Sequence, residues 1–383
     1  MKKLYCSFLL LTFLFILTAC NASDEGKNPI DKEGSHATSN DNVKPSVKGV
    51  KNVDVLNTHG SIEGVERMKN FYDNLQNGIS SDLRIVHYTI EGDPIVTDLN
   101  YKEDTIKVTY DSTRDKFGSG KITTVICNNL LEEVNPTNTS YIATGCSDGF
   151  FGMDEILEIE YNLARQDLFE LELKYGEKLE NEVNTKTEEV TKVINSKETR
   201  TTSDFQLSTQ VKQEVFKRLV MANYLGDLDL KTTCQSEESR DYYLKVYING
   251  GDREYHWSSC DQGSDGVKFT EIAEYVIMQS EMEQTENPET VIQGYILQVK
   301  DDTLLVGVDL NIFDYELLKD EIQNTELDAY VFDFISLEGV NTEEFKIGDK
   351  IEAVIKGSIT GSNPGRAKVE EMKKQQPVES IVP

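Results

Sequence analysis

The sequence predicts an α+β protein, with antiparallel sheets and packed helices in two domains and a small C-terminal β-barrel of OB (oligonucleotide/oligosaccharide-binding) type. Three observations lead to this prediction. Short stretches in which apolar and polar residues alternate, which is typical of half-buried strands, recur along the chain. Apolar residues at helical spacing occur in only a few segments. The last third combines short strand patterns, one helix pattern and a KIGDK turn.

Changes in composition divide the chain into six predicted parts. The stretch between the N-terminus and the first strand pattern is polar and cannot bury enough apolar surface to fold, so it is predicted to be a disordered tether. The parts are a signal peptide (1–19), a lipidated cysteine with the tether (20–52), two α+β domains (53–163 and 164–284), the barrel (285–374) and a tail (375–383).

In the first domain, Ser61 is expected to cap a helix whose apolar face carries Val65, Met68, Tyr72 and Leu75, ending at Gly78. Alternation predicts strands in the stretches RIVHYTI (84–90), IVTDLNY (95–101), TIKVTY (105–110), ITTVICNNL (122–130), SYIATGC (140–146) and EILEIEY (155–161). All of them are expected to form one antiparallel sheet with the helix packed across it.

The second domain is expected to contain two helices and an antiparallel sheet. Ser208 is the predicted cap of a helix that ends at Gly226, and 268–281 is the closing helix. Strands are predicted at 168–176, 178–194, 228–234, 242–250 and 253–260, with a turn at Asn249-Gly250-Gly251. In the third domain, strands are predicted at 291–299, 302–308, 328–336, 346–357 and 366–372, and a helix at 314–322.

The N-terminus predicts export and a lipid anchor. Two lysines precede an apolar core from Phe8 to Leu17, which is shorter than the roughly twenty residues that a membrane span needs. The LTAC stretch that ends in Cys20 resembles a bacterial lipobox, which implies diacylation of Cys20 and a place on the cell membrane, outside the cytoplasm. The alternative is an ordinary signal peptide with a chance cysteine, or an uncleaved anchor.

The formal net charge of −29 argues against nucleic acid as a partner, because phosphate contacts need clustered Lys and Arg. Outside the cytoplasm, the four cysteines of the folded part, Cys127, Cys146, Cys234 and Cys260, predict disulfides. Three pairings are open. We favour neighbour pairing, Cys127 with Cys146 and Cys234 with Cys260, because each pair then falls within one predicted domain. Their spacing does not fit a zinc site.

The search for catalytic and ligand-binding patterns leaves two candidate surfaces. In HYTIEGDPIVTDLNY, Glu91 and Asp93 lie in a predicted hairpin turn, and they are also the candidates for an acidic site. In REYHWSS, Tyr255 and Trp257 share one strand face, either in the core or as a ligand-facing patch. DQGSDG (261–266) fits a calcium loop poorly, and FGSGK lacks the pattern of a phosphate loop. No catalytic residue, metal or cofactor is predicted.

The stretches NTHGSIEGVERMKNFYDNLQNG, RIVHYTIEGDPI and YDSTRDKFGSGK resemble a family of Bacillus-type lipoproteins with an N-terminal domain of unknown function. GYILQV, FKIGDKIEAVIKGSI and SNPGRAKVEEM resemble a second domain of unknown function, the YobA-like family. Asn363 stands where that family often carries an aromatic residue. The resemblance implies an envelope location and no particular activity.

These observations predict a lipid-anchored, non-enzymatic protein that binds an envelope protein, peptide or wall component. One alternative is an enzyme that acts on envelope polymers through carboxylates such as Glu91 and Asp93. Another is an inhibitor or sensor of a secreted partner.

Overall fold

The computed structural model describes residues 47, 49–59, 61–148, 152–233, 239–282, 290–300, 302–322, 327 and 330–375. Of the described residues, 46% are in strands and 19% in helices. The predicted α+β class is therefore wrong, and the protein is mainly β. Strands outnumber the predicted ones, because the stretch predicted as one strand at 178–194 forms two strands and a further strand follows at Glu198–Ser203. The predicted signal peptide, Cys20 and the predicted tether as far as residue 46 lie outside the described residues. Val47 and Val50, near the end of the predicted tether, are buried against Val86 and Val96, so the folded part begins before the predicted residue 53.

The first sheet has six strands in the order β2-β1-β3-β4-β5-β6. Their bounds are β1 Val55–Thr58, β2 Ser61–Glu63, β3 Ser81–Tyr88, β4 Pro94–Lys102, β5 Thr105–Asp111 and β6 Ile122–Cys127. Neighbours pair antiparallel except β1 and β3, which are parallel. The predicted hairpin at Glu91–Asp93 is confirmed, because Tyr88 of β3 pairs with Pro94 of β4.

Helix α1, Val65–Gln76, does not begin as predicted. Ser61 belongs to β2, and the N-cap residue of the helix is Gly64, whose φ of 81° places it in the left-handed region. A Cβ at this glycine would lie 2.0 Å from the carbonyl oxygen of Asp54, so only glycine fits there. The buried face of the helix consists of Val65, Met68, Phe71 and Leu75, so Phe71 takes the place predicted for Tyr72.

The strands after Cys127 form a sheet of their own, which corrects the prediction that they complete the first sheet. It consists of β7 Asn129–Val134, β8 Asn138–Thr144 and β9 Met153–Glu160, paired antiparallel in this order. Every residue of β8 is buried, because both faces of this small sheet are covered. The predicted Cys127–Cys146 disulfide is confirmed and joins the end of β6 to the segment after β8.

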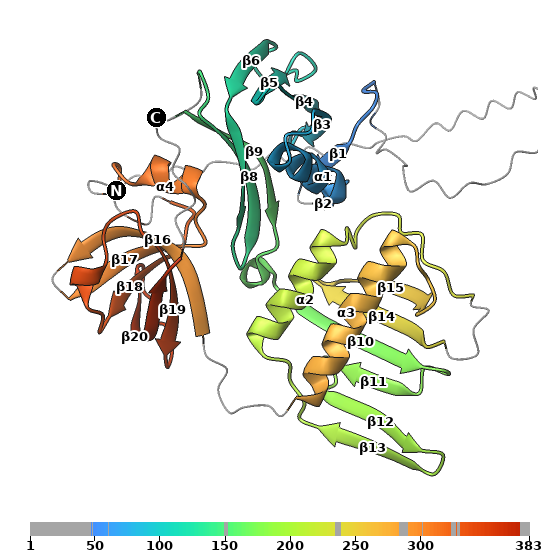
Figure 1. Cartoon of the computed structure of the whole chain (residues 1–383). Helices are drawn as coiled ribbons and strands as arrows, with labels where there is room; N and C mark the ends of the chain where they lie inside the picture. Colours follow the sequence, from blue (N-terminus) through green and yellow to red (C-terminus); the bar gives the residue numbers. More distant parts are fainter. Residues whose placement is uncertain are drawn as a thin grey trace, which may run out of the picture. The chain divides into compact units, whose positions relative to one another are not determined.

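The third sheet has the order β13-β12-β11-β10-β14-β15. Its strands are β10 Phe169–Gly176, β11 Asn181–Asn184, β12 Glu189–Asn195, β13 Glu198–Ser203, β14 Asp241–Ile248 and β15 Gly251–Ser258. Helices α2, Thr209–Met221, and α3, Ser264–Glu281, pack on each other, and α3 also contacts β11 and β14 (Figure 1). One apolar cluster runs from Val55 to Ile277, so this core continues that of the first sheet.

Two expectations for this region need correction, and one is confirmed. Ser208 caps α2 as predicted, since its hydroxyl accepts a hydrogen bond from Val211 N at 3.2 Å, but the helix ends at Met221 rather than at Gly226. Residues 228–233 form no strand. Lys231 instead makes isolated bonds, donating its N–H to Asp261 Oδ2 at 2.8 Å and accepting from Ser258 N at 2.9 Å. The predicted partner of Cys260, Cys234, lies outside the described residues.

The C-terminal unit pairs its five strands in the closed order β16-β17-β18-β20-β19, whereas the other three sheets are open. The strands are β16 Thr290–Lys300, β17 Thr303–Val308, β18 Phe334–Glu338, β19 Lys350–Lys356 and β20 Gly365–Lys374. β18 and β20 are parallel. Helix α4, Ile312–Leu318, precedes β18, which is shorter than the predicted strand at 328–336. Short 3₁₀ turns lie at η1 Leu163–Arg165 and η3 Thr342–Glu344. No helix in the described ranges is long and apolar enough to cross a membrane.

Candidate functional site

The predicted acidic turn ties two loops together. Asp93 is only 7% exposed, and its carboxylate accepts hydrogen bonds from Lys116 Nζ at 2.8 Å and from Lys116 N at 3.1 Å. The hydrogen bond from the Lys116 side chain lowers the pKa of Asp93. Glu91 is exposed at the tip of the same turn. Asp93 therefore holds the loop between β5 and β6 against the β3–β4 hairpin. Of the two predicted acids, only Glu91 faces solvent.

Tyr255 and Trp257 lie in the core, which is the alternative that the sequence left open. Trp257 is 1% exposed, stacks on Tyr242 with ring centroids 5.1 Å apart and donates its indole N–H to Thr270 Oγ1 at 2.9 Å. Tyr255 is 6% exposed and donates its hydroxyl to Tyr224 O at 2.6 Å. Both rings are enclosed and their polar atoms are satisfied, so core packing accounts for both residues. Tyr255 also contributes, with Arg253 and His256, to the lining of a pocket of about 490 Å³.

The DQGSDG stretch is the turn that leads into α3. Asp261 is 4% exposed, and its carboxylate accepts from Gly263 N at 3.0 Å and from Lys231 N at 2.8 Å. Asp265 Oδ2 accepts from Asp229 N at 2.9 Å. Backbone N–H groups thus occupy the carboxylate oxygens that a cation would need. Within the described ranges, no group of three or more His, Cys, Asp or Glu side chains has the arrangement of a metal site.

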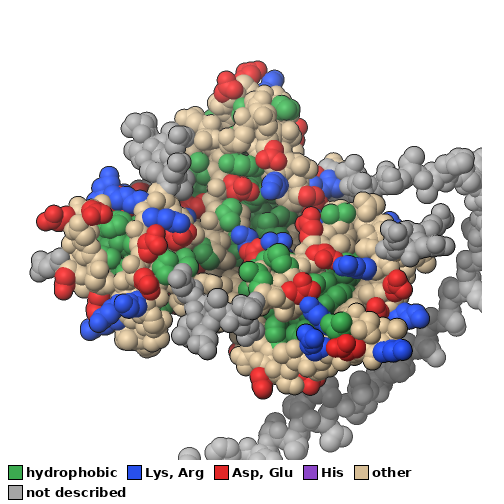
Figure 2. Space-filling model, turned by 60° about the horizontal axis from the view of Figure 1, so that its bottom comes forward, with side chains coloured by type: hydrophobic (Ala, Val, Ile, Leu, Met, Phe, Trp, Pro, Cys, Tyr) green, Lys and Arg blue, Asp and Glu red, His purple; other side chains and the backbone are tan. Residues whose placement is uncertain are grey.

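A groove between α1, α2 and α3 has the character of a binding site. Its floor is apolar and is formed by Val65 of α1, Met221 and Ala222 at the end of α2, and Ile272 of α3. The cavity volume is about 240 Å³. Small-molecule sites usually have roughly 300–1,000 Å³, so this groove suits one or two side chains of a larger partner. Hydrophobic side chains also lie exposed among Lys, Arg, Asp and Glu on the face drawn in Figure 2.

Charged side chains surround this apolar floor. The cations are Lys69, Arg218 and Lys268, and the acids are Glu66 and Glu271. Arg218 pairs with Glu214 at 2.8 Å, and Lys268 lies 3.9 Å from Glu66. Lys69 is exposed and has no ion-pair partner within the described part of the chain. The rim therefore carries both signs of charge, with three cations and two acids.

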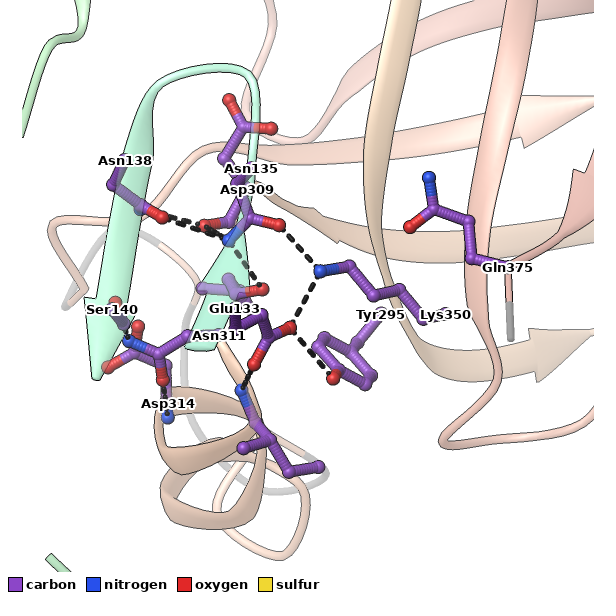
Figure 3. Close-up of polar contacts among 12 residues, drawn as sticks. Glu133, Asn135, Asn138, Ser140, Tyr295, Asp309, Asn311, Asp314, Lys350 and Gln375 are labelled. Atoms are coloured by element: carbon purple, nitrogen blue, oxygen red, sulfur yellow. Dashed lines mark hydrogen bonds and ion pairs between the residues drawn. The ribbon is translucent and has the colours of Figure 1, made fainter. Parts of the chain in front are cut away.

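A buried polar network joins the β7–β9 sheet to the C-terminal unit (Figure 3). Glu133 of β7 accepts from Lys350 Nζ at 2.6 Å, Tyr295 OH at 2.9 Å and Ile312 N at 2.7 Å. Lys350 also donates to Asn135 Oδ1 at 2.6 Å. These bonds satisfy both members of an ion pair that is almost fully enclosed, which is the condition for burying charge without a large penalty.

Asn311 extends this network to β8 and β9. Its side-chain amide donates to Ser140 Oγ and to Glu155 Oε1, each at 2.9 Å, and its Oδ1 accepts from Asp314 N at 2.9 Å, which caps α4. A polar cavity of about 230 Å³ lies beside these residues and is lined by Glu158, Asp309 and Asp314 among others. Burial raises the pKa of Asp309 to about 6.

The sequence did not point to this network. Glu133, Glu155 and Glu158 occupy polar positions of strand patterns, where solvent exposure is the usual expectation. One available signal was the SYIAT stretch, which carries no charged residue and becomes the buried β8. That signal indicates cover on both faces of the strand, but it does not identify the covering residues.

Comparison with known proteins places two parts of this chain among modules of unknown function. Residues 52–142 match a family described as "Domain of unknown function (DUF4362)", and residues 293–373 match "Protein of unknown function (DUF3221)". The crystal structure of a YobA protein from Bacillus subtilis subsp. subtilis strain 168 shares 20% identity over 24% of this chain and 99% of that chain, with a TM-score of 0.19. No curated protein matches. These matches confirm that the chain contains two modules of unknown function, as the resemblance implied.

Proposed function

We propose that this protein is a lipid-anchored, non-enzymatic binding protein of the bacterial envelope. The groove between α1, α2 and α3 is the observation that carries the binding function, because it joins an apolar floor to a charged rim in which Lys69 is exposed and has no ion-pair partner within the described residues. The lipobox at Cys20 and the polar tether after it support anchoring outside the cytoplasm. The groove volume of about 240 Å³ favours a short segment of an envelope protein or peptide over a whole small molecule.

The chemistry of the groove selects an apolar segment that carries a carboxylate. An apolar side chain would bury against Met221 and Ile272, at roughly 25 cal/mol per Å² of apolar area removed from water. A carboxylate beside it would meet Lys69 and Lys268 at the rim. Because this rim is exposed, its charges would contribute more to the selection of the partner and to the association rate than to the affinity.

Binding of the anionic aromatic dye anilinonaphthalene sulfonate (ANS) tests the groove. The wild-type protein is expected to show saturable fluorescence enhancement, and Lys69→Glu/Lys268→Glu should weaken it about tenfold. Lys102→Glu is the matched control, because Lys102 is 68% exposed on the β4–β5 turn and does not line the groove. Unchanged dye binding in the double variant, or an equal loss in the control, would count against the groove.

The anchor is tested separately by the mass of the mature protein and by cell fractionation. A diacylated N-terminal Cys20 is expected in the membrane fraction, and Cys20→Ala should be released or mislocalised. Because an unprocessed precursor could also stay in the membrane, the mass is the decisive measurement. A wild-type mass without lipid would refute the anchor and would leave the groove untouched.

A further inference from the structure

Three carboxylates gather where β9 of the three-stranded sheet packs against α4. They are Glu155 and Glu158 of β9 and Asp314 in the first turn of α4. Glu155 is held by the amide of Asn311 at 2.9 Å. No Lys, Arg or His forms an ion pair with any of the three within the described residues. Such a group of like charges opposes close packing whenever its members are ionised.

The surroundings add acids and little free positive charge. The other charged groups here are Asp154 and Glu160 of β9, Glu133 of β7, Glu316 and Lys319 of α4 and its end, Asp309 and Asp333 of the C-terminal unit, Arg165 of η1 and Lys350 of β19. All three cations are already engaged, since Lys350 pairs with Glu133 at 2.6 Å, Arg165 pairs with Glu160 and Lys319 pairs with Glu316 at 2.5 Å. The two elements therefore meet across an excess of carboxylates.

The pKa values of all three carboxyls are raised, which favours their neutral forms. Burial, reinforced by Glu155 and Asp314, raises the pKa of Glu158 to about 8. Burial and the charge of Glu155 raise the pKa of Asp314 to about 7, and burial also raises the pKa of Glu155. The neutral form is therefore the one that suits the packed arrangement.

We propose that the contact between β9 and α4 is a proton-dependent joint, in which protonation of Glu155, Glu158 and Asp314 closes the contact and their ionisation loosens it. The joint is independent of the groove, and its failure would leave the proposed binding function intact. Its role in the envelope would be to couple the packing of α4 to the acidity outside the cytoplasm.

The sign of the effect follows from proton linkage. A carboxyl whose pKa is higher in the packed state than in the open state takes up a proton on packing, so packing weakens as pH rises between the two pKa values. For this group the window runs from about 4, the ordinary carboxyl range, to about 8, the pKa of Glu158. The apolar contacts of Ile142 and Met153 with the C-terminal unit oppose complete separation.

Amide hydrogen exchange of α4, measured on the folded chain at pH 5.5 and pH 8 and corrected for the intrinsic rate, tests this joint. Exchange over residues 312–318 should be about tenfold faster at pH 8, while residues 209–221 of α2 should show no such change. Glu155→Gln/Glu158→Gln/Asp314→Asn removes the three ionising groups and keeps their neutral shape, so its α4 should exchange slowly at both pH values.

Glu254→Gln is the matched control, because Glu254 lies on β15, pairs with Lys245 at 2.7 Å and faces no part of the joint. It should keep the wild-type pH dependence. Equal protection of wild-type α4 at the two pH values would overturn the proposal. So would a pH dependence that persists in the triple variant, because the response would then come from other groups.

Discussion

Lys350 Nζ lies 2.6 Å from Glu133 Oε1, although 217 residues separate the two in sequence, and their side chains are only 5% and 2% exposed. The pair connects the first strand of the three-stranded sheet to the C-terminal unit. Taking two charges out of water is expensive, so such a pair is stable only when further hydrogen bonds surround it. Here Asn135, Tyr295 and the N–H of Ile312 supply them.

Replacing Lys350 by Met should destabilise the protein by about 3–5 kcal/mol, because the carboxylate of Glu133 would remain buried without its counter-charge. Urea unfolding at constant pH, followed by circular dichroism, measures the loss. The double variant Lys350→Met/Glu133→Gln should recover part of it, because it removes the uncompensated charge as well.

The pair between Lys373 and Glu352 is a matched control. Its N···O distance is also 2.6 Å, but the Lys373 side chain is 64% exposed. Lys373→Met should therefore destabilise the protein far less than Lys350→Met, because solvent screens an exposed pair. Similar losses in Lys350→Met and Lys373→Met would show that burial does not set the value of the Glu133 pair.

The Cys127–Cys146 disulfide should contribute about 3 kcal/mol, because it closes a loop across a sequence separation of 19 in the unfolded chain. It links the first sheet, which contains β6, to the three-stranded sheet, and these two sheets share one core. The variant Cys127→Ala/Cys146→Ala, compared with the wild type by urea unfolding, measures the contribution. A variant as stable as the wild type would mean that native packing alone fixes the two sheets.

Local elements were predictable from the sequence because their causes are local. The turn between β14 and β15 contains Asn249 and Gly250 with φ of 48° and 83°, the left-handed pair that an Asn-Gly hairpin requires. The cap of α2 needed only Ser208 and the apolar positions after it. The predicted cap of α1 was wrong because the residue at this position must be a glycine. Gly64 closely approaches the backbone of Asp54, and Asp54 lies outside the helix pattern.

The long-range arrangement was not predictable because alternation identifies the faces of a strand without naming what covers them. In β8, Tyr141 packs in the large core, whereas Ile142 packs against the C-terminal unit. The same limit hid the site. Glu158 looked like an exposed strand position, and its burial depends on a helix more than 150 residues away in the chain. The groove likewise requires three helices from different segments.

Asp93 provides the last prediction, because it gives the hairpin turn a role that Glu91 does not share. Its carboxylate accepts hydrogen bonds from Lys116 N at 3.1 Å and from Lys116 Nζ at 2.8 Å. Asp93→Ala should free the β5–β6 loop, so trypsin should cut after Arg114, Lys116 or Lys121 faster than in the wild type. Glu91→Ala is the matched control and should leave the cleavage rate unchanged, since Glu91 is exposed at the tip of the turn.

The same loop should respond to acid in the direction opposite to the β9–α4 joint. The hydrogen bond from Lys116 lowers the pKa of Asp93, so its contribution is present above the ordinary carboxyl pKa of about 4. It is lost as pH falls through the lowered pKa. Amide exchange of residues 113–118, corrected for the intrinsic rate, should therefore accelerate below pH 4 in the wild type and be fast at all pH values in Asp93→Ala. Protection that survives in the variant would mean that the loop is held by its own hydrogen bonds, such as the one from Lys121 N to Ser112 Oγ at 3.2 Å.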